Sequence, residues 1–374
     1  MKPLRVAFVA GSLTQGGAEK QFVYMARALR DAGAEVDIYS LTRGEYYEAA
    51  LIEEGIPPIW VGRWGAPAVR LAALASMMLK RRPHIVQSTH FFGNLYAALL
   101  GRVSGALGIG SIRNDAHFDM SANGRWGPWL LRMPQVLLAN SWAAQHNAAT
   151  MGIRPNRIHV VPNVIDLGEF DRQGDDTARQ LPSEAPTAIA VCRLVAMKRL
   201  DRFIHALVLA RRDVPALRGT IVGDGPERGP LERLAADAGL NGACTFVGRS
   251  DCVPRLMRQA DMLVLSSEHE GFPNVVLEAM AARLPVVATP AGDVKRVVSD
   301  GETGYVVPSD DVRAMAERMV RLATSATLRR ELGNAGRVRV EQSYSFSALG
   351  GRLRSVYCSM ASEQRDMRAL TVLQ

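Results

Sequence analysis

The sequence predicts an α/β protein made of two domains, each with a parallel sheet covered by helices. A chain of 374 residues is too long for one typical hydrophobic core, so two domains are expected. Short apolar runs alternate with amphipathic segments through the first half, and the alternation restarts at Thr187. The hydrophobic share of 48% and the charged share of 22% are those of a soluble globular protein.

In the first half, short apolar runs are expected to form strands, with helices between them. The segment Gln21–Leu29 is amphipathic and is followed by Gly33, which predicts a helix between two parallel strands. The segment Arg63–Arg82 has apolar residues at helical spacing and ends in cations. It can lie on a membrane, but we favour a surface helix packed on the sheet. The expected strands are Arg5–Ala10, Glu35–Ser40, Ile85–Gln87, Gly108–Ile112 and Val136–Ala139.

The second half repeats this pattern. Domain boundaries are expected at 1–165 and 166–344, with a linker around Arg172–Pro186 and a terminal helix in 345–374 that crosses back to the first domain. The helix after Asn274 must end by Pro285. The other expected elements are strands within Thr187–Arg193, Thr220–Gly223, Cys244–Arg249 and Asp261–Leu265, and helices Leu200–Ala210 and Ser345–Met360.

The stretch Ser266–Pro285 is the most informative part of the chain. Glu270 follows a buried strand and Glu278 lies eight residues later in a helix. Ligands of open α/β sheets bind beyond the carboxyl ends of the strands, and helix N-termini favour anions. A phosphate would suit the amides of the loop Gly271-Phe272-Pro273-Asn274, and hydroxyls would suit the carboxylates. The alternative is a solvated helix and an ordinary loop charge.

Two cations accompany a second strand-to-helix loop. Arg193 stands at a strand's carboxyl end, and Lys198 lies just before a helix N-terminus. Two cations five residues apart can hold a diphosphate from two sides. Phosphates and hydroxyls together describe a nucleotide sugar.

The first loop, Gly11–Glu19, satisfies neither of two phosphate-binding motifs. A P-loop would need Lys and Ser or Thr where Gly17 and Ala18 stand, and G-x-G-x-x-G is absent. The pair Gly16-Gly17 still allows a ligand to approach the backbone closely. A tight turn without a ligand is the alternative.

The residues around the two glutamates resemble the donor-site signature of the GT4-type retaining glycosyltransferases (group 1), which have the GT-B fold. The resemblance covers nearly the whole chain, most strongly residues 187–308. It implies two Rossmann-like domains facing across a cleft, with Glu278 at the donor ribose, Glu270 at the transferred sugar, and Arg193 with Lys198 at the diphosphate. It also places Gly16 and Gly17 near the donor phosphate and the acceptor.

Two other positions bear on catalysis by this resemblance. His90 follows the strand Ile85–Gln87, where the family has a histidine lining the acceptor side; a structural histidine is the alternative. Arg113 takes the place of a second family histidine. An arginine cannot act as a base, but it could stabilise the departing diphosphate or hold an acidic acceptor.

The net charge of +8 is concentrated in residues 1–165, where 17 Lys and Arg face 10 Asp and Glu. The cations are dispersed and no nucleic-acid motif accompanies them, so we expect contact with anionic membrane and not with nucleic acid. Trp126 and Trp129, beside Arg125 and Arg132, suit a membrane interface, but we favour packing in an ordinary core. Without a signal-like segment or paired cysteines, we expect a cytoplasmic location, with peripheral contact at the inner face of the plasma membrane as the further expectation.

We therefore expect transfer of a hexosyl or N-acetylhexosaminyl group, with retention, from a nucleotide-diphosphate sugar, most plausibly a UDP-sugar, to a glycan or lipid-linked acceptor of surface polysaccharide biosynthesis. No metal and no further cofactor is expected, because no metal-ligand cluster occurs in the sequence. A sugar-nucleotide epimerase of GT-B fold and a non-catalytic nucleotide-sugar-binding protein remain alternatives. A dinucleotide-dependent oxidoreductase is excluded by the missing G-x-G-x-x-G.

Overall fold

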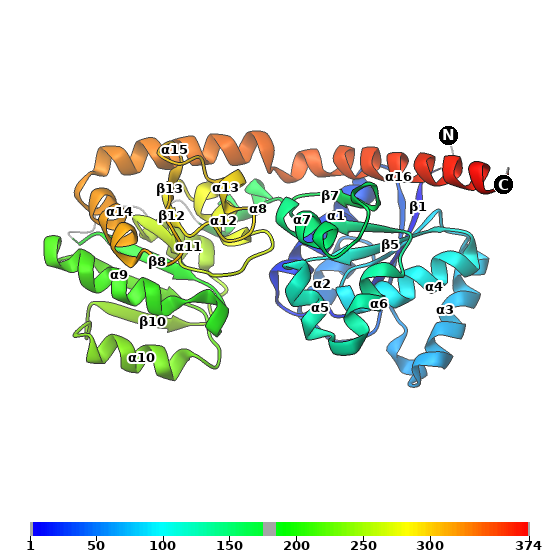
Figure 1. Ribbon diagram of the computed structural model, residues 1–374, viewed down its shortest axis with the longest axis horizontal. Helices are drawn as coiled ribbons and strands as arrows, with labels where there is room; N and C mark the ends of the chain where they lie inside the picture. The colour runs from blue at the N-terminus through cyan, green and yellow to red at the C-terminus, as the bar shows by residue number, and fades with distance from the viewer. Residues whose placement is uncertain (1–2, 175–184, 373–374) are drawn as a thin grey trace. The chain divides into compact units, whose positions relative to one another are not determined.

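The computed structural model describes residues 3–174 and 185–372. The chain divides into two compact units, residues 1–164 with 346–374 and residues 165–345 (Figure 1). The expected linker is only partly seen. Arg172 belongs to helix α8 (Leu167–Gly174) of the second unit, and residues 175–184 lie outside the described residues.

The first unit is a parallel α/β layer structure. Its described residues form a sheet of seven strands in the order β3-β2-β1-β4-β5-β6-β7, and all neighbouring pairs are parallel. This is a doubly wound order, in which the chain moves outward in both directions from β1. The strands are β1 (Arg5–Ala10), β2 (Glu35–Ser40), β3 (Ile59–Trp60), β4 (Ile85–Ser88), β5 (Leu107–Ile112), β6 (Val136–Ala139) and β7 (Ile158–Val160).

Helices cover both faces of this sheet. Helices α1 and α16 pack on one face in a single apolar cluster, whereas α3 and α4 pack on the other (Figure 1). Helix α3 is the expected surface helix: Leu74 and Met78 are buried and its last residues are cationic. The helices are α1 (Gly17–Asp31), α2 (Tyr46–Glu53), α3 (Pro67–Arg81), α4 (Asn94–Ser104), α5 (Ala116–Ala122), α6 (Gly127–Arg132), α7 (Trp142–Thr150) and α16 (Leu349–Val372).

The second unit has the same plan. The part of it that the structure describes holds six parallel strands in the order β10-β9-β8-β11-β12-β13. The strands are β8 (Thr187–Val191), β9 (Arg218–Val222), β10 (Cys244–Gly248), β11 (Met262–Leu265), β12 (Val286–Ala288) and β13 (Gly304–Val306). Besides α8, the helices are α9 (Leu200–Asp213), α10 (Arg228–Asp237), α11 (Val253–Gln259), α12 (Asn274–Ala281), α13 (Val294–Val297), α14 (Val312–Thr324) and α15 (Ala326–Ser343).

The predicted fold class of two parallel α/β layers is confirmed. The strands expected at Arg5–Ala10, Glu35–Ser40 and Val136–Ala139 have those bounds in the structure. The central strands β4, β5, β6 and β11 are buried along their whole length, as strands covered on both faces must be. Among the described residues, no helix combines the length and the hydropathy that a membrane span requires.

The expectation for the two tryptophans is wrong. Trp126, in the short helix η3 (Gly124–Trp126), is 60% exposed, and Trp129 in α6 is 66% exposed. The apolar contacts of this segment are made instead by Leu131, which is buried beside α5 and α7.

The last helix of the chain belongs to the first unit. Tyr357 of α16 is buried and donates a hydrogen bond to Gln87 Oε1 of β4 at 2.5 Å. Burial raises the pKa of Tyr357 above its ordinary value, so the phenol remains neutral and keeps its proton for this bond. The bond ties the C-terminal part of the chain to the centre of the first sheet.

An ion-pair cluster fixes α8 in the second unit. Asp171 accepts hydrogen bonds from both terminal nitrogens of Arg337 on α15, at 2.9 and 2.8 Å, and from Arg258 on α11 at 2.8 Å. The hydrogen bond from Arg337 is the main cause of a pKa of Asp171 below its ordinary value. The single carboxylate therefore joins three helices.

We predict that Asp171→Asn lowers the free energy of unfolding by about 1–3 kcal/mol, between the values for exposed and buried ion pairs. Because the folded-state pKa of Asp171 is lowered, its stabilisation is complete above the unfolded pKa and is lost as the pH falls through the folded value. Denaturant unfolding of native and variant chains should therefore converge in acid. Asp237→Asn, at an exposed position of α10, is the control; equal losses for both variants at neutral pH would contradict the prediction.

Candidate functional site

The candidate site of the second unit is built from loops at one edge of its sheet. These loops follow β8, β9, β11 and β12, four strands that lie side by side in the sheet in the order β9-β8-β11-β12. Because all strands are parallel, their carboxyl ends meet at the same edge, and the order reverses at β8. The loops are residues 192–199, 223–227, 266–273 and 289–293.

An ion pair joins the two central loops. Lys198 Nζ lies 2.6 Å from Glu270 Oε1, and the Ser267 hydroxyl donates to the same oxygen at 2.7 Å. The side chains of Lys198 and Glu270 are only 20% and 12% exposed. The two residues predicted to act on the donor are thus brought into direct contact, and Ser267 is a member that sequence reasoning missed.

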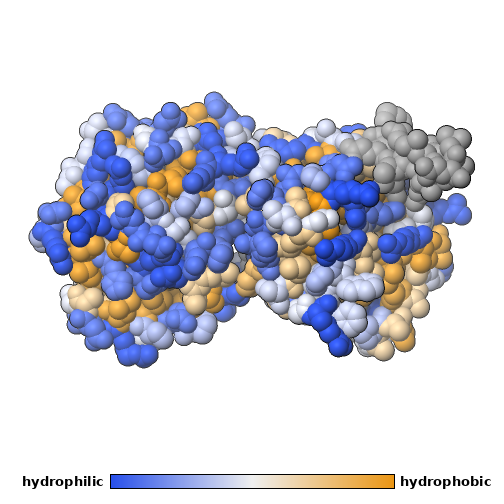
Figure 2. All heavy atoms as spheres, viewed as in Figure 1, coloured by the Kyte–Doolittle hydropathy of each residue, from blue (hydrophilic) through white to orange (hydrophobic). Residues whose placement is uncertain are grey.

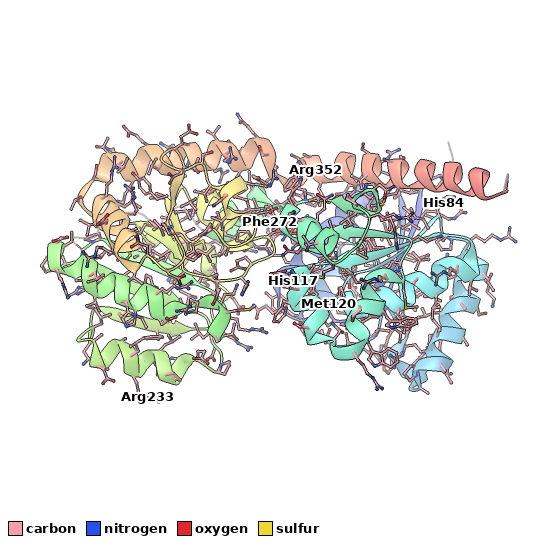
Figure 3. The ribbon with its side chains drawn as sticks, in the orientation of Figure 1. His84, His117, Met120, Arg233, Phe272 and Arg352 are labelled. Carbon is pink, nitrogen blue, oxygen red and sulfur yellow. The ribbon has the colours of Figure 1, made fainter. Side chains whose placement is uncertain are left out.

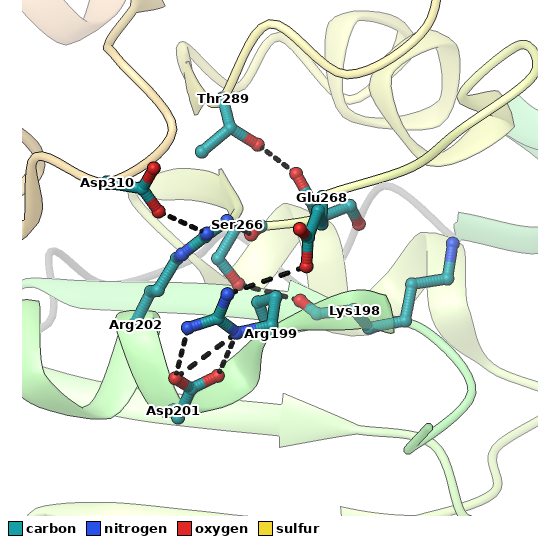
Figure 4. Close-up of polar contacts among 9 residues, drawn as sticks. Lys198, Arg199, Asp201, Arg202, Ser266, Glu268, Thr289 and Asp310 are labelled. Atoms are coloured by element: carbon teal, nitrogen blue, oxygen red, sulfur yellow. Dashed lines mark hydrogen bonds and ion pairs between the residues drawn. The ribbon is translucent and has the colours of Figure 1, made fainter. Parts of the chain in front are cut away.

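The backbone beneath the pair is also cross-linked (Figure 4). The Ser266 hydroxyl donates to the carbonyl of Lys198 at 3.0 Å, and Thr289 Oγ1 donates to the carbonyl of Ser267 at 2.5 Å. Gly292 has a positive φ of 56°, and a Cβ there would lie 2.5 Å from the Glu270 carbonyl. Only glycine permits the loop after β12 to press this closely against Glu270.

Arg199 completes the loop after β8 in an unusual backbone conformation. Its φ is 46°, in the left-handed region that favours glycine. Asp201 holds the guanidinium at 3.0 and 2.9 Å, and Glu268 lies 3.5 Å from it. These side-chain hydrogen bonds help to hold Arg199 in its left-handed conformation.

Arg193 is presented differently from Lys198. Its side chain is exposed, and no hydrogen bond or ion pair to another described residue is seen. The backbone beside it is tightly packed, because a Cβ on Gly225 would lie 2.3 Å from the Leu194 carbonyl. Because its backbone is fixed and its guanidinium has no partner among the described residues, Arg193 is suited to bind an anion from solution.

The helix N-terminus at α12 is adjacent to Glu270. Asn274 begins α12, and Pro273 precedes it in an extended conformation. The Phe272 side chain is buried against Tyr344, with ring centroids 5.7 Å apart (Figure 3), so Phe272 can offer only its backbone to a ligand. Glu278 lies one turn further along α12 and is half-buried.

A cysteine lies next to the ion pair. Burial raises the pKa of the Cys192 thiol to about 12, with Lys198 and Glu270 acting on it in opposite directions. The thiol is therefore protonated at neutral pH and a weak nucleophile. Cys244 is similarly shielded, whereas Cys252 and Cys358 are exposed.

The first unit holds a second carboxylate cluster, centred on Glu19. Its Oε1 lies 3.2 Å from His90 Nε2 and accepts hydrogen bonds from Ser12 at 3.0 Å and Thr14 at 3.2 Å. Burial raises the pKa of Glu19, but the hydrogen bonds from His90 and Ser12 outweigh it, and the pKa lies below its ordinary value. Sequence reasoning missed Glu19, although its place in the first turn after paired glycines was a signal.

The contacts of His90 define its tautomer. A carboxylate only accepts, so Nε2 carries a hydrogen toward Glu19, and Nδ1 lies 2.8 Å from the Thr89 hydroxyl. Its ring is stacked on Phe92 with centroids 5.6 Å apart. In the neutral form both ring nitrogens have partners within the first unit.

Gly16 and Gly17 lie where α1 begins. A Cβ on Gly16 would be 2.3 Å from Glu19 Oε2, so the space beside this glycine is occupied by the protein's own carboxylate. Gly16 thus allows Glu19 to fold back over the helix N-terminus, a position that also favours an anion.

Arg113 is buried in the first unit. Its guanidinium lies 3.0 Å from Met25 Sδ on α1, and its Nε has no hydrogen-bond partner among the described residues. Burial lowers the pKa of Arg113 to about 10, still well above neutrality. The Arg113 carbonyl accepts from Asn140, and its amide donates to Asp119, so the backbone is fixed where β5 ends.

The predicted site residues therefore fall into two groups. One edge of the second sheet carries Arg193, Lys198, Glu270, Gly271–Asn274 and Glu278. One edge of the first sheet carries Gly16, Gly17, His90 and Arg113, of which Arg113 has its guanidinium buried against Met25. Within the described residues, no group of three His, Cys, Asp or Glu side chains has the spacing to hold a metal ion.

Comparison with known families matches both halves of the chain. Residues 15–169 match the family described as Glycosyltransferase Family 4, and residues 171–339 match Glycosyl transferases group 1. The chain belongs to the GT4-type glycosyltransferases.

Relatives of this glycosyltransferase include the lipopolysaccharide core biosynthesis glycosyltransferase LpsE of Rhizobium meliloti, 28% identical over 58% of the chain. The chain spans about three-fifths of the length of LpsE, 62%. A GDP-mannose-dependent phosphatidylinositol monomannoside mannosyltransferase of Mycolicibacterium smegmatis is 29% identical, over 84% of this chain and 79% of the relative. The crystal structure of Anabaena HepE with UDP and glucose has a TM-score of 0.82 at 20% identity, covering 95% of this chain and all of HepE. This likeness establishes the GT-B fold.

We predict that Lys198 and Glu270 stabilise each other. Each charge is largely buried, so Lys198→Met or Glu270→Gln alone leaves a poorly compensated partner and should destabilise the glycosyltransferase. The double variant should lose less than the sum, giving a coupling energy of about 1–3 kcal/mol in denaturant unfolding. The same cycle on the exposed pair Arg228–Glu232 is the control and should give less than about 1 kcal/mol. Additive losses at Lys198 and Glu270 would show that the pair is not formed in solution.

Proposed function

We propose that this glycosyltransferase moves a hexosyl or N-acetylhexosaminyl group, with retention, from a UDP-sugar to a glycan or lipid-linked acceptor of surface polysaccharide biosynthesis. The observation that carries the proposal is the contact between Lys198 and Glu270 beside the N-terminus of α12. It combines a cation for phosphate, a carboxylate for sugar hydroxyls and backbone amides at one strand edge.

The second unit would hold the donor. The exposed guanidinium of Arg193 and the ammonium of Lys198 would neutralise the diphosphate, whose charge grows as the glycosidic bond breaks. The amides of Gly271, Phe272 and Asn274 would bind phosphate or sugar oxygens. Glu278 would accept hydrogen bonds from the ribose hydroxyls.

Glu270 would contact the transferred sugar. Ser267 holds one carboxylate oxygen of Glu270, which leaves the other oxygen for a hydroxyl. Lys198 would turn from Glu270 toward the diphosphate when the donor binds, because the diphosphate carries more charge. The ion pair thus keeps both groups desolvated and charged before binding.

The first unit would provide the acceptor side. His90, held by Glu19 and Thr89, offers a fixed imidazole, and Gly16 with Gly17 offers backbone amides at the start of α1. Arg113 would act as a buried positive charge, since its guanidinium is enclosed by Met25 and does not reach the surface freely.

The relatives support the choice of donor and setting. HepE has been solved with UDP and with UDP-glucose, which favours uridine as the nucleotide. LpsE is named for lipopolysaccharide core biosynthesis, which favours a surface glycan as the product. We further propose that no metal cofactor takes part, because Arg193 and Lys198 already supply positive charge at the leaving group.

We predict that the two glutamates divide binding and catalysis. Glu278→Gln should weaken UDP and UDP-sugar alike and raise KM, because the ribose does not react. Glu270→Gln should lower kcat without weakening UDP, since it removes a contact near the reacting carbon and frees Lys198. Calorimetry with UDP and steady-state transfer, after a thermal-shift screen of nucleotide sugars, provide the measurements.

Glu317→Gln, on an exposed turn of α14, is the matched control and should change neither quantity. Loss of UDP binding in Glu270→Gln together with unchanged binding in Glu278→Gln would reverse the roles. Turnover of UDP-sugar without any acceptor, giving an altered sugar nucleotide, would indicate an epimerase. Binding without turnover across a panel of acceptors would indicate a binding protein.

We predict that transfer survives exhaustive chelation. Arg193 and Lys198 would supply the positive charge at the diphosphate that a metal ion could otherwise supply. Initial rates with and without excess chelator should agree within about twofold, a difference of less than half a kcal/mol in the barrier. A chelated enzyme that recovers only on addition of Mg²⁺ or Mn²⁺ would contradict the metal-free mechanism.

A further inference from the structure

The exposed apolar side chains of the described residues are concentrated in the first unit. Of the 13 large hydrophobic residues that are exposed, 11 belong to this unit and only Val247 and Val338 to the second. Single exposed hydrophobics are normal on protein surfaces, so a docking surface requires that several of these side chains lie close together.

Two tryptophans dominate this set. Trp126 and Trp129 are 60% and 66% exposed, and Phe118 of α5 is 42% exposed. They belong to one packed segment, because α5, η3 and α6 contact one another. His117 and Met120 mark the position of α5 in Figure 3. A tryptophan has a large apolar body with one N–H, which suits the boundary between lipid headgroups and acyl chains.

Further apolar side chains extend from this segment along neighbouring helices. Helix α6 contacts α4, and α4 contacts α3. In Figure 2, hydrophobic surface is visible over the region that α3 and α4 occupy in Figure 1. The exposed large apolar residues of these two helices are Val69 and Leu79 of α3, and Leu95 and Val103 of α4.

The charge of these elements has one sign. Residues 55–114 contain seven Lys and Arg and no Asp or Glu. From 115 to 165 the acids are Asp115, which is half-buried, and Asp119, which is buried. Residues 3–54 of the same unit hold eight acids, of which Asp37 pairs with Arg81 of α3 at 3.9 Å. The acid-free surface, meaning the part that has no fully exposed acid of its own, is therefore confined to α3–α7. An exposed surface with cations, aromatic rings and no exposed carboxylate is complementary to an anionic bilayer.

The cations stand beside the apolar anchors. Arg125 lies over the Trp126 ring at 5.1 Å, and the last turn of α3 carries Lys80 and Arg81 next to Leu79. At a bilayer, the guanidinium and ammonium groups would meet lipid phosphates while the rings and aliphatic chains enter the interface.

We propose that the face formed by α3, α4 and the α5–η3–α6 segment docks this protein on an anionic lipid bilayer, with Trp126 and Trp129 as the interfacial anchors. A nucleic acid would need the cations and rings, but it would leave Val69, Leu79 and Val103 exposed to water. A bilayer covers the cations, the rings and the aliphatic side chains together, which is why lipid is favoured. The inference does not rest on glycosyl transfer, since docking needs neither donor nor acceptor.

The test is sedimentation of the full chain with vesicles of equal parts phosphatidylcholine and phosphatidylglycerol. The native chain should bind these vesicles and should bind pure phosphatidylcholine vesicles at least about tenfold more weakly. Binding to the anionic vesicles should fall as the salt concentration rises toward about 1 M. Trp126→Ser with Trp129→Ser should weaken binding by about tenfold or more, which corresponds to a loss of about 1.4 kcal/mol or more for the two side chains together. Both tryptophans are largely exposed, so thermal unfolding should be unchanged.

Tyr46→Ser is the matched control, because Tyr46 is 56% exposed on α2 of the same unit, outside the acid-free surface. This variant should bind vesicles like the native chain. In the native chain, lipids brominated near the headgroup should quench tryptophan fluorescence, and Trp126→Phe with Trp129→Phe should lose most of that quenching.

Several results would overturn the proposal. These are equal binding to neutral and anionic vesicles, vesicle binding that survives loss of both tryptophans, and an equal loss in Tyr46→Ser. Tighter binding to RNA than to vesicles, with no effect of the tryptophans, would assign the surface to nucleic acid. Self-association that the double variant abolishes, without vesicle binding, would assign it to a second copy of the chain.

Discussion

The organisation of the second unit depends on one ion pair, between Lys198 and Glu270. The pair requires that the loops after β8 and β11 lie close enough for Lys198 Nζ and Glu270 Oε1 to be 2.6 Å apart. Because β8 and β11 are adjacent parallel strands, the topology places the loops side by side, and Ser266, Thr289 and Gly292 hold them there. Both side chains are largely shielded from water, so each charge is offset mainly by the other.

The first unit also contains a buried carboxylate, and different residues compensate its charge. Glu19 is buried at the start of α1 and is neutralised in part by the His90 N–H and two hydroxyls. In both units a carboxylate is therefore oriented at a sheet edge before any ligand arrives. Groups whose orientation is set in advance need little reorganisation when substrate charge develops, which is the main electrostatic advantage of an enzyme site over water.

The sequence was sufficient for the architecture and for placing the predicted donor-binding residues at one edge of the second sheet, because buried parallel strands and strand-to-helix loops leave strong local patterns. Strands β3, β7, β12 and β13 were missed, since runs of two or three residues carry almost no periodicity. Spacing alone could not tell that Arg113 would turn inward toward Met25, or that Trp126 would remain outside. Such orientations depend on tertiary packing, as does the contact of Glu19 with His90, which are separated by 71 residues.

The shielding of Cys192 has a practical consequence. Its thiol and that of Cys244 stay protonated at neutral pH, whereas the exposed Cys252 lies in the second unit and Cys358 in the first. Alkylating reagents attack accessible thiolates, so the natural chain offers one labelling position on each unit and spares the thiol beside the ion pair. A pair of fluorophores or spin labels attached there would follow the distance between the units as nucleotide binds, without engineering a single residue.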